Sequence, residues 1–471
     1  MNQSDYLAQD AVGLAALIAA RQVSAAEVVE AALTRLEAVN PRLNAVTLEL
    51  GEQALAEVNH GDPAGVLGGV PYLIKDLGAQ VAGTPTTAGS RILGTAPAVA
   101  DSAIVTAYRK AGLVIIGKTN TPEFGLEPVT EPTRFGPSRN PWELERTPGG
   151  SSGGASAAVA GGITPAAHAS DGGGSIRIPA ACCGLVGMKP SRGRVSFAPA
   201  DEGWGGFSIQ HAVSWTVRDS ATLLDAVSTP QPGDPYWRDP PQRSFAKEVG
   251  AEPGVLRIAF TTAALAAPAI EPQCAAAVRE IARLCESLGH QVEEAQLPGD
   301  YAAAGAAAGT VIAASVAAML ETEGARRGRP VSEDEVEAVT WATYQRGRGV
   351  SGAAYVQALQ GAHAYGRVVA EFFERFDVLL LSTLGSPAIP IGALRGVPPK
   401  EYAERLFAFM PNTQAFNMTG QPAISLPLAT SAEGLPIGLQ FVGRTGDEGL
   451  LYRLAGQLEQ ARPWAERRPM L

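Results

Sequence analysis

The sequence predicts an α/β fold in which helices cover both faces of a β-sheet. Short apolar segments of strand length alternate with helical patterns along the whole chain, which is typical of a layered sheet. No internal repeat interrupts this alternation. The chain has 471 residues, 46% of them hydrophobic, which is enough to bury a large core.

The first elements can be located from their ends. Ser24 and Glu27 have the spacing of a capping box, and apolar residues follow at near-helical spacing until Pro41, which predicts a helix between these points. Residues 69–76 (GVPYLIKD) then predict a short buried strand that ends in a lysine. A helix over 105–111 and a strand over 113–117 follow.

Later segments repeat these patterns as far as the C-terminal part of the chain. The pattern predicts strands over 163–169, 185–188, 256–260 and 378–381, and a helix over 274–288. Residues 229–241 are rich in proline and aspartate and predict a long surface loop between two parts of one domain.

Charge and cysteine content exclude several classes of partner. The formal net charge is −10, with 47 acidic and 37 basic residues, and no lysine or arginine run suits a phosphate backbone. We therefore expect no nucleic acid. No Cys-x-x-Cys or His-x-x-x-His spacing offers a zinc site, so we expect no metal, and four thiols without a framework fit a reducing compartment. We also expect no cofactor.

Neither the N-terminal segment nor the most apolar stretch of the chain predicts a membrane or secreted protein. Residues 1–10 lack a secretory signal, so we expect a cytoplasmic location. Residues 302–320 carry no charge and approach transmembrane length, but they are mostly alanine and glycine. We expect a buried helix there and no membrane contact.

Two glycine-serine clusters carry the chemistry. Residues 147–154 read TPGGSSGG, and residues 171–175 read DGGGS. Glycine lets the backbone approach a ligand closely, so that successive N–H groups can point at one anion, as in an oxyanion hole. Such clusters also occur in flexible loops. The clusters alone therefore leave two interpretations open, an oxyanion hole and a flexible loop.

Ser151 also fits the nucleophile motif of another class of hydrolases. Residues 149–153 match the G-x-S-x-G nucleophile elbow. An elbow needs an apolar strand that runs into the first glycine, whereas residues 140–148 (NPWELERTP) are polar and contain two prolines. The local sequence therefore disfavours an elbow.

A serine hydrolase needs a general base, and the histidines of this chain are poor candidates for it. Of five histidines only His168 lies near a cluster, and its position favours a hydrogen-bonded core histidine. Lys75 is the alternative, because a buried strand end should lower its pKa and let it accept a proton. Taken alone, Lys75 is better explained by an ion pair with Asp76 or another carboxylate.

The joint pattern resembles the amidase signature family. It consists of a strand ending in Lys75, then GGSSGG, then DGGGSIRIPA, with 175 − 151 = 24 positions between the two serines. The resemblance covers nearly the whole chain and includes residues 117–125 (GKTNTPEFG), 184–196 (GLVGMKPSRGRVS), 376–380 (FDVLL), 416–427 (FNMTGQPAISLP) and 434–443 (GLPIGLQFVG). Within the family, residues 170–185 look most like the branch of 6-aminohexanoate-cyclic-dimer hydrolases and related broad amidases.

The resemblance implies a role for each site residue. The catalytic triad would be Lys75 as base, Ser151 as a bridging serine held by a cis peptide, and Ser175 as nucleophile. The oxyanion hole would be formed by the backbone N–H groups of Gly172, Gly173, Gly174 and Ser175. The side chains that hold these loops would be Ser152, Asp171 and Arg177.

The fold that the resemblance implies is one large domain over residues 1–471, with a mixed, twisted sheet covered by helices on both faces. Its parts would be N-terminal helices over 1–60, a catalytic core over about 61–228, a variable helical part that lines the substrate pocket over about 242–375, and a C-terminal sheet and helix part over 376–471. Within these, residues 123–134 and 301–349 are candidates to line the pocket, although ordinary helix packing explains the second segment more simply.

The implied function is a serine hydrolase that cleaves carboxamide C–N bonds through an acyl-enzyme. Its partner would be a small-molecule amide: an anilide, a cyclic or oligomeric amide, or a related ester or carbamate. Whether the chain forms a homodimer stays open. A glutamyl-tRNA amidotransferase A subunit is the main alternative, but such subunits typically carry threonine and glutamine where this chain has Gly172 and Ile178. A catalytically inactive binding protein on the same fold is a third.

Overall fold

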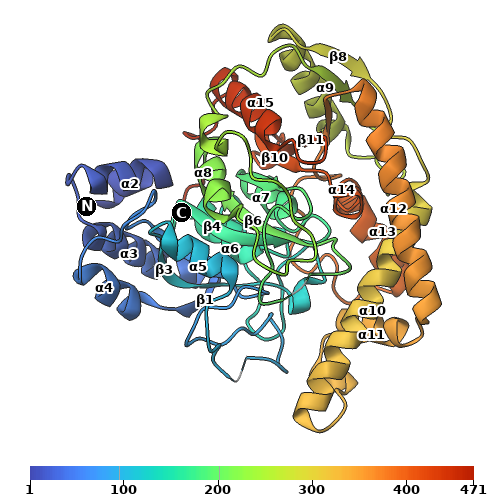
Figure 1. Cartoon of the computed structure of the whole chain (residues 1–471), viewed down its shortest axis with the longest axis horizontal. Helices are drawn as coiled ribbons and strands as arrows, with labels where there is room; N and C mark the ends of the chain where they lie inside the picture. Colours follow the sequence, from blue (N-terminus) through green and yellow to red (C-terminus); the bar gives the residue numbers. More distant parts are fainter. Residues whose placement is uncertain (95, 201) are drawn as a thin grey trace.

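A single mixed β-sheet forms the centre of the computed structural model, which describes residues 1–94, 96–200 and 202–471. Its strands are β1 (Val46–Glu49), β2 (Pro71–Lys75), β3 (Val114–Thr119), β4 (Ala166–Asp171), β5 (Val186–Lys189), β6 (Ile209–Ser214), β7 (Arg257–Phe260), β8 (Gln291–Glu294), β9 (Val378–Ser382), β10 (Ala423–Thr430) and β11 (Pro436–Gly443). Their order is β1-β3-β2-β4-β6-β5-β10-β11-β9-β7-β8 (Figure 1). Strand β2 pairs in parallel with β3 and β4, and β7 with β8 and β9, whereas the other neighbours are antiparallel.

Helices surround this sheet, and the helices between residues 301 and 409 lie together to one side of it (Figure 1). They are α1 (Gln3–Leu7), α2 (Ala11–Ala19), α3 (Ala25–Leu43), α4 (Gly51–Asn59), α5 (Ala103–Lys110), α6 (Gly153–Ala160), α7 (Arg177–Cys183), α8 (Val217–Val227), α9 (Pro272–Ser287), α10 (Tyr301–Arg327), α11 (Ala338–Arg348), α12 (Gly352–Arg375), α13 (Pro399–Phe409), α14 (Ala415–Thr419) and α15 (Glu448–Ala461). Short 3₁₀ turns are η1 (Glu123–Gly125), η2 (Phe245–Lys247) and η3 (Glu333–Glu335). Helix α6 packs on α7 and α8 packs on α15, and both pairs contact the central strands, so the expected α/β fold is confirmed.

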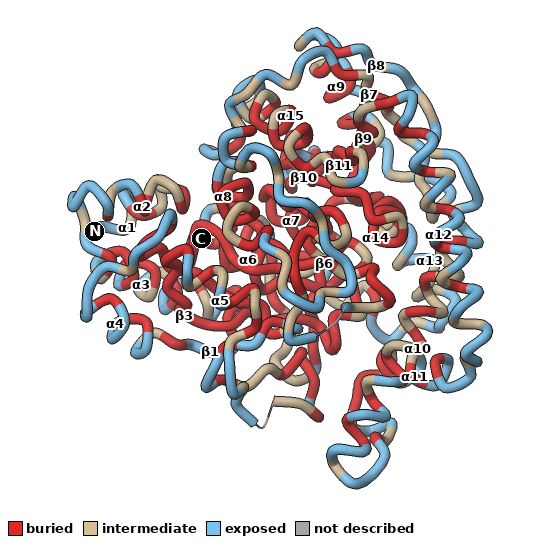
Figure 2. The backbone as a smooth tube through the Cα atoms, viewed as in Figure 1, coloured by how far each residue is buried: buried red, intermediate tan, exposed pale blue. Residues whose placement is uncertain are grey.

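Buried residues are concentrated in the sheet and in α6 and α7. Figure 2 shows this interior in red, whereas the outer sides of α10 to α12 are exposed. Strands β2, β3, β5, β6 and β9 are buried along their whole length, which explains why those with apolar sequences read as continuous hydrophobic runs. Each strand predicted from an apolar run is present, within three residues of its expected ends.

Helix α3 begins at the predicted residue but ends later than the sequence predicted. The capping box at α3 is present, since the Glu27 N–H donates to Ser24 Oγ (3.2 Å) and the Ser24 N–H donates to the Glu27 carboxylate (2.9 Å). The helix does not stop at Pro41, however, but continues to Leu43. Proline removes only one backbone hydrogen bond in this last turn, and Asn44 ends the helix in the left-handed region with φ 47°.

Helix α10 is buried on one face only. It packs against α11, α12 and α14, and Ala304, Ala308 and Val311 face this contact. Ala302 and Ala306 are exposed. The helix is long and apolar enough to span a membrane, and 39% of its most apolar window is buried in the structure. The expectation of a buried helix is therefore correct for one face of α10. Small alanine side chains let this face pack closely against its neighbours, and the opposite face stays exposed.

The predicted boundary at 229–241 is a loop, without helix or strand in the structure. Strands β7 and β8 fall inside the part predicted as helical and yet belong to the same sheet as the catalytic core. The division of the domain into four parts stays a prediction.

Candidate active site

Parallel pairing brings the two predicted catalytic segments to one edge of the sheet. Strand β2 ends at Lys75 and β4 ends at Asp171, and their register pairs Leu73 with Ala167. The carboxyl ends of parallel neighbours lie side by side, so the lysine and the glycine loop 171–175 meet there. Helix α6, which follows Ser151 and Ser152, packs on both strands and carries the second cluster to the same place.

Lys75 lies directly beside Ser151. Its Nζ is 2.7 Å from Ser151 Oγ and 3.0 Å from Ser170 Oγ, and the lysine is fully buried. Burial lowers the pKa of Lys75 to about 7, and the negative charge of Asp171 opposes this shift only in part. Within the described residues no carboxylate lies within ion-pair distance of Lys75. A buried amine poised between its charged and neutral forms can act as a base.

Asp76 pairs with a different lysine. The Nζ of Lys118 is 2.7 Å from Asp76 Oδ1 and also donates to the Pro85 carbonyl (2.7 Å) and to Thr86 Oγ1 (2.8 Å). Asp76 accepts in addition the Thr87 N–H (3.1 Å). The ion pair that the sequence alone suggested for Lys75 and Asp76 is therefore wrong, because Lys118 on the neighbouring strand β3 takes the carboxylate.

Glycines allow the backbone to close around Ser151. The Gly150–Ser151 peptide bond is cis. A Cβ on Gly150 would lie 2.7 Å from the Val129 backbone, and one on Gly125 would lie 3.1 Å from Ser151 Oγ. The 123–134 loop thus reaches the site, as the sequence predicted. Residues 141–150 form turns and no strand, so the nucleophile elbow is excluded.

Asp171 fixes the glycine loop from inside. Its carboxylate accepts two hydrogen bonds from Arg177, at 2.9 Å each, and one from the Asn417 side chain at 2.8 Å. It also accepts the N–H groups of Gly174 (2.7 Å) and Ile176 (3.2 Å). Burial alone would raise the pKa of Asp171, but the Arg177 guanidinium holds it well below its usual value. The loop is therefore held by a permanently charged, saturated carboxylate.

This contact corrects one part of the predicted oxyanion hole. The Gly174 N–H donates to the Asp171 carboxylate (2.7 Å), so this one of the four predicted donors is already engaged within the loop. The N–H groups of Gly172, Gly173 and Ser175 have no acceptor among the residues that the structure describes. An added Cβ on Gly173 would find no atom nearer than 4.0 Å, so this side of the loop is open.

Ser152 joins the two serine loops. Its N–H donates to the Ser175 carbonyl (3.3 Å), and its Oγ donates to the Ser170 carbonyl (3.2 Å). Ser175 is partly exposed, and it immediately precedes the segment that leads into α7. Sequence reasoning gave no role to Ser170, although it is the second partner of Lys75. Its place one residue before Asp171 was the available signal.

His168 is a core histidine, as expected from the sequence. Its Nδ1 accepts the Lys75 backbone N–H (3.3 Å), and its Nε2 lies 3.2 Å from Gln210 Oε1. Burial, together with the positive charge of Lys75, lowers the pKa of His168 to about 3, so the ring stays neutral. It positions the end of β2 through the backbone.

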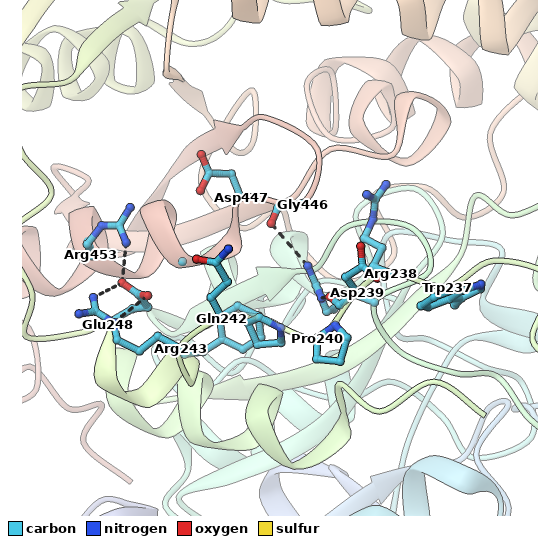
Figure 3. A pocket seen from close by; sticks show the side chains of 14 residues that line it. Trp237, Arg238, Asp239, Pro240, Gln242, Arg243, Glu248, Gly446, Asp447 and Arg453 are labelled. Carbon is cyan, nitrogen blue, oxygen red and sulfur yellow. Dashed lines mark hydrogen bonds and ion pairs between the residues drawn. The ribbon is translucent and has the colours of Figure 1, made fainter. Parts of the chain in front are cut away.

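A cavity of about 850 Å³ lies elsewhere, between the start of α15 and residues 237–248 (Figure 3). None of the predicted catalytic residues lines it. Two of its arginines, Arg243 and Arg453, pair with Glu248. Glu248 is therefore neutralised by arginines of the same cavity.

Comparison with known proteins points to one group. A family profile described as Amidase matches residues 27–452. The chain is 38% identical to a 6-aminohexanoate-cyclic-dimer hydrolase of Paenarthrobacter ureafaciens, over 98% of this chain and 97% of that protein. A solved structure of 6-aminohexanoate cyclic dimer hydrolase superposes with a TM-score of 0.93 at 38% identity, covering 98% of this chain and 99% of the other. A bacterial aryl acylamidase structure gives a TM-score of 0.89 at 27% identity, with coverage of 98% and 99%.

Proposed function

Because this chain belongs to the Amidase family of hydrolases that act on amides, we propose that it cleaves carboxamide C–N bonds with a triad of Lys75, Ser151 and Ser175. One observation carries the proposal: a fully buried lysine lies 2.7 Å from Ser151 Oγ and has no carboxylate partner among the described residues. A buried lysine without a counter-charge is costly, and such a feature is typical of a functional site.

The proton path starts at the neutral form of Lys75. Its lone pair accepts the proton of Ser151, while one of its N–H groups donates to Ser170. Ser151 then accepts the proton of Ser175 as the Ser175 oxygen attacks the substrate carbonyl carbon. Ser151 returns a proton to the leaving nitrogen, and the amine departs from an acyl-enzyme. Water attacks this ester and loses its proton along the same path, which releases the carboxylate product.

The oxyanion that forms in each step would be held by backbone donors. The N–H groups of Gly172, Gly173 and Ser175 are the candidates, because they are not committed within the described structure. Backbone donors fixed in advance cost no reorganisation when the charge develops. Asp171 and Arg177 contribute indirectly, since they fix the loop that presents these groups.

The proposed substrates are broad or xenobiotic amides, including anilides and cyclic or oligomeric amides. The names of the similar proteins support these two classes, one as a cyclic dimer hydrolase and one as an aryl acylamidase. Esters and carbamates share the reacting carbonyl and could use the same relay. A cytoplasmic location and action without nucleic acid remain part of the proposal.

The test uses the purified chain alone with p-nitroanilides, aliphatic amides, cyclic amides and carbamates, ranked by kcat/KM. We expect release of amine or ammonia without any added partner, and its loss in Ser175→Ala with an unchanged thermal melting curve. Activity that appears only with a partner subunit and charged tRNA would favour the amidotransferase alternative. No hydrolysis of any class would favour an inactive binding protein.

A further inference from the structure

Thr130 holds both sides of the turn that carries Ser151. Its hydroxyl donates a hydrogen bond to the Gly149 carbonyl (2.9 Å) and accepts one from the Gly153 N–H (3.2 Å). A single hydroxyl can do both, because it has one donor and two acceptor positions. The Thr130 side chain therefore connects the backbone before Ser151 with the backbone after it.

The contact between Thr130 and this turn is tight and buried. A Cβ on Gly153 would lie 2.3 Å from Thr130 Oγ1, and one on Gly150 would lie 2.7 Å from the Val129 backbone. Thr130 and Val129 are both buried. A methyl group in place of the Thr130 hydroxyl would fill the same space, so the two backbone groups of the turn would lose this partner and gain no room for water.

Thr130 is itself held by other parts of the chain. Its carbonyl accepts the Ser138 N–H (2.9 Å). The carboxylate of the next residue, Glu131, accepts the Gly392 N–H (3.1 Å), and the Glu131 carbonyl accepts a hydrogen bond from the Arg395 guanidinium. Thr130 is thus anchored independently of the turn, so its hydroxyl can fix the position of the turn.

The position of the turn sets the distance on which the proposed proton path depends. Ser151 Oγ lies 2.7 Å from Lys75 Nζ. Because Lys75 belongs to β2 and Ser151 to the turn, a movement of the turn changes this distance directly. Proton transfer requires heavy atoms within about 2.6 to 3.2 Å, and a displacement of about 1 Å can cost ~100-fold in rate.

We propose that Thr130 is a positioning residue, whose hydroxyl holds Ser151 where it can pass protons between Lys75, Ser175 and the leaving nitrogen. This inference rests on the proposed function. The Thr130 side chain has no exposed surface, so it acts through the backbone of the turn and not by contact with a substrate.

The test compares Thr130→Val, which keeps the shape of the side chain but removes the hydroxyl, with Thr130→Ser, which keeps the hydroxyl. Each variant is assayed with the anilide and the 4-nitrophenyl ester of one carboxylic acid. Both reactions need Ser151 to accept the Ser175 proton. Only the anilide also needs a proton on its leaving group, because 4-nitrophenolate departs as an anion.

We expect kcat/KM of Thr130→Val for the anilide to fall about 10- to 100-fold, and by at least about threefold more than for the ester. A general loss of folded protein would lower both rates by the same factor. Thr130→Ser should retain most of the wild-type activity on both substrates, because both hydrogen bonds remain possible. Thermal melting curves of all variants are recorded alongside.

The matched control is Thr222→Val. Thr222 of α8 is also buried, and its hydroxyl donates to the Arg218 carbonyl (2.8 Å), but it is not part of the predicted site. This variant should leave both rates unchanged. If Thr130→Val does not fold, Thr130→Cys replaces it, because a thiol is only a weak donor and acceptor.

Three results would overturn the role of Thr130 alone: wild-type rates in the variant without the hydroxyl, an equal loss in Thr130→Ser, or an equal loss on the ester and the anilide. A wild type that cleaves neither the anilide nor the ester contradicts the proposed function itself.

Discussion

Replacing Lys75 by arginine should remove most of the activity although it keeps the positive charge. Burial lowers the pKa of Lys75 to about 7, so about half of these side chains are neutral at pH 7, compared with roughly one in three thousand at the ordinary lysine pKa. A guanidinium has essentially no neutral form at this pH. Since a general base typically contributes about 10²- to 10⁴-fold, we expect kcat/KM of Lys75→Arg to fall at least ~100-fold.

The assay is the pH profile of kcat/KM for a p-nitroanilide between about pH 5 and pH 9. The wild-type value should rise as the pH rises through about 7, because deprotonation creates the form of Lys75 that accepts the Ser151 proton. Lys75→Met fills a similar volume without a base and should lack this rise. Retention of more than about a tenth of the activity in Lys75→Arg, or a wild-type profile that is flat around pH 7, would refute the assignment of Lys75 as the base.

Three other changes test the loop and its surroundings. Asp171→Asn leaves the buried charge of Arg177 without its partner and should lower the free energy of unfolding in urea by about 3 to 5 kcal/mol; a change near zero would contradict the role of this pair. Gly174→Ala should reduce kcat/KM at least about tenfold, because Gly174 has a φ of 135° and the new Cβ would clash with Thr413 Oγ1; wild-type activity would show that the loop is not tightly held. Burial raises the pKa of Glu127 to about 7 from the ordinary glutamate value of about 4.5, so the folded protein holds a proton there that the unfolded chain releases. The melting temperature of the wild type should therefore fall relative to Glu127→Gln as the pH rises from about 4.5 through about 7, and parallel curves would contradict this.

Local sequence was informative where one segment determines its own structure. The apolar run before Lys75 gave the buried strand, and the capping box gave the start of α3. Strand β6 was missed because it carries Gln210 and His211. Their polar side chains are accepted in the interior only because His168, Ser196 and Ser220 lie beside them. No local pattern reports such partners.

The site shows the same limit. The sequence could place Lys75 beside Asp76 but could not show that Lys118, from the next strand, takes that carboxylate. It could place four backbone donors in the glycine loop but not show that Asp171 uses the one from Gly174. Both outcomes depend on which residue, distant in the sequence, the fold brings within hydrogen-bond distance of the group. Family resemblance supplied the roles of the serines. Geometry then showed that the N–H groups of Gly172, Gly173 and Ser175 have no acceptor in the described part of the chain.

The most direct test of the triad is covalent labelling by a fluorophosphonate, followed by intact mass and peptide mapping. We expect one adduct, on Ser175, formed by the wild type and strongly slowed in Lys75→Met and Ser151→Ala, because both variants interrupt the path that removes the Ser175 proton. An adduct on Ser151, or equal labelling rates in the wild type and Lys75→Met, would contradict the assignment of Ser175 as nucleophile and Lys75 as base.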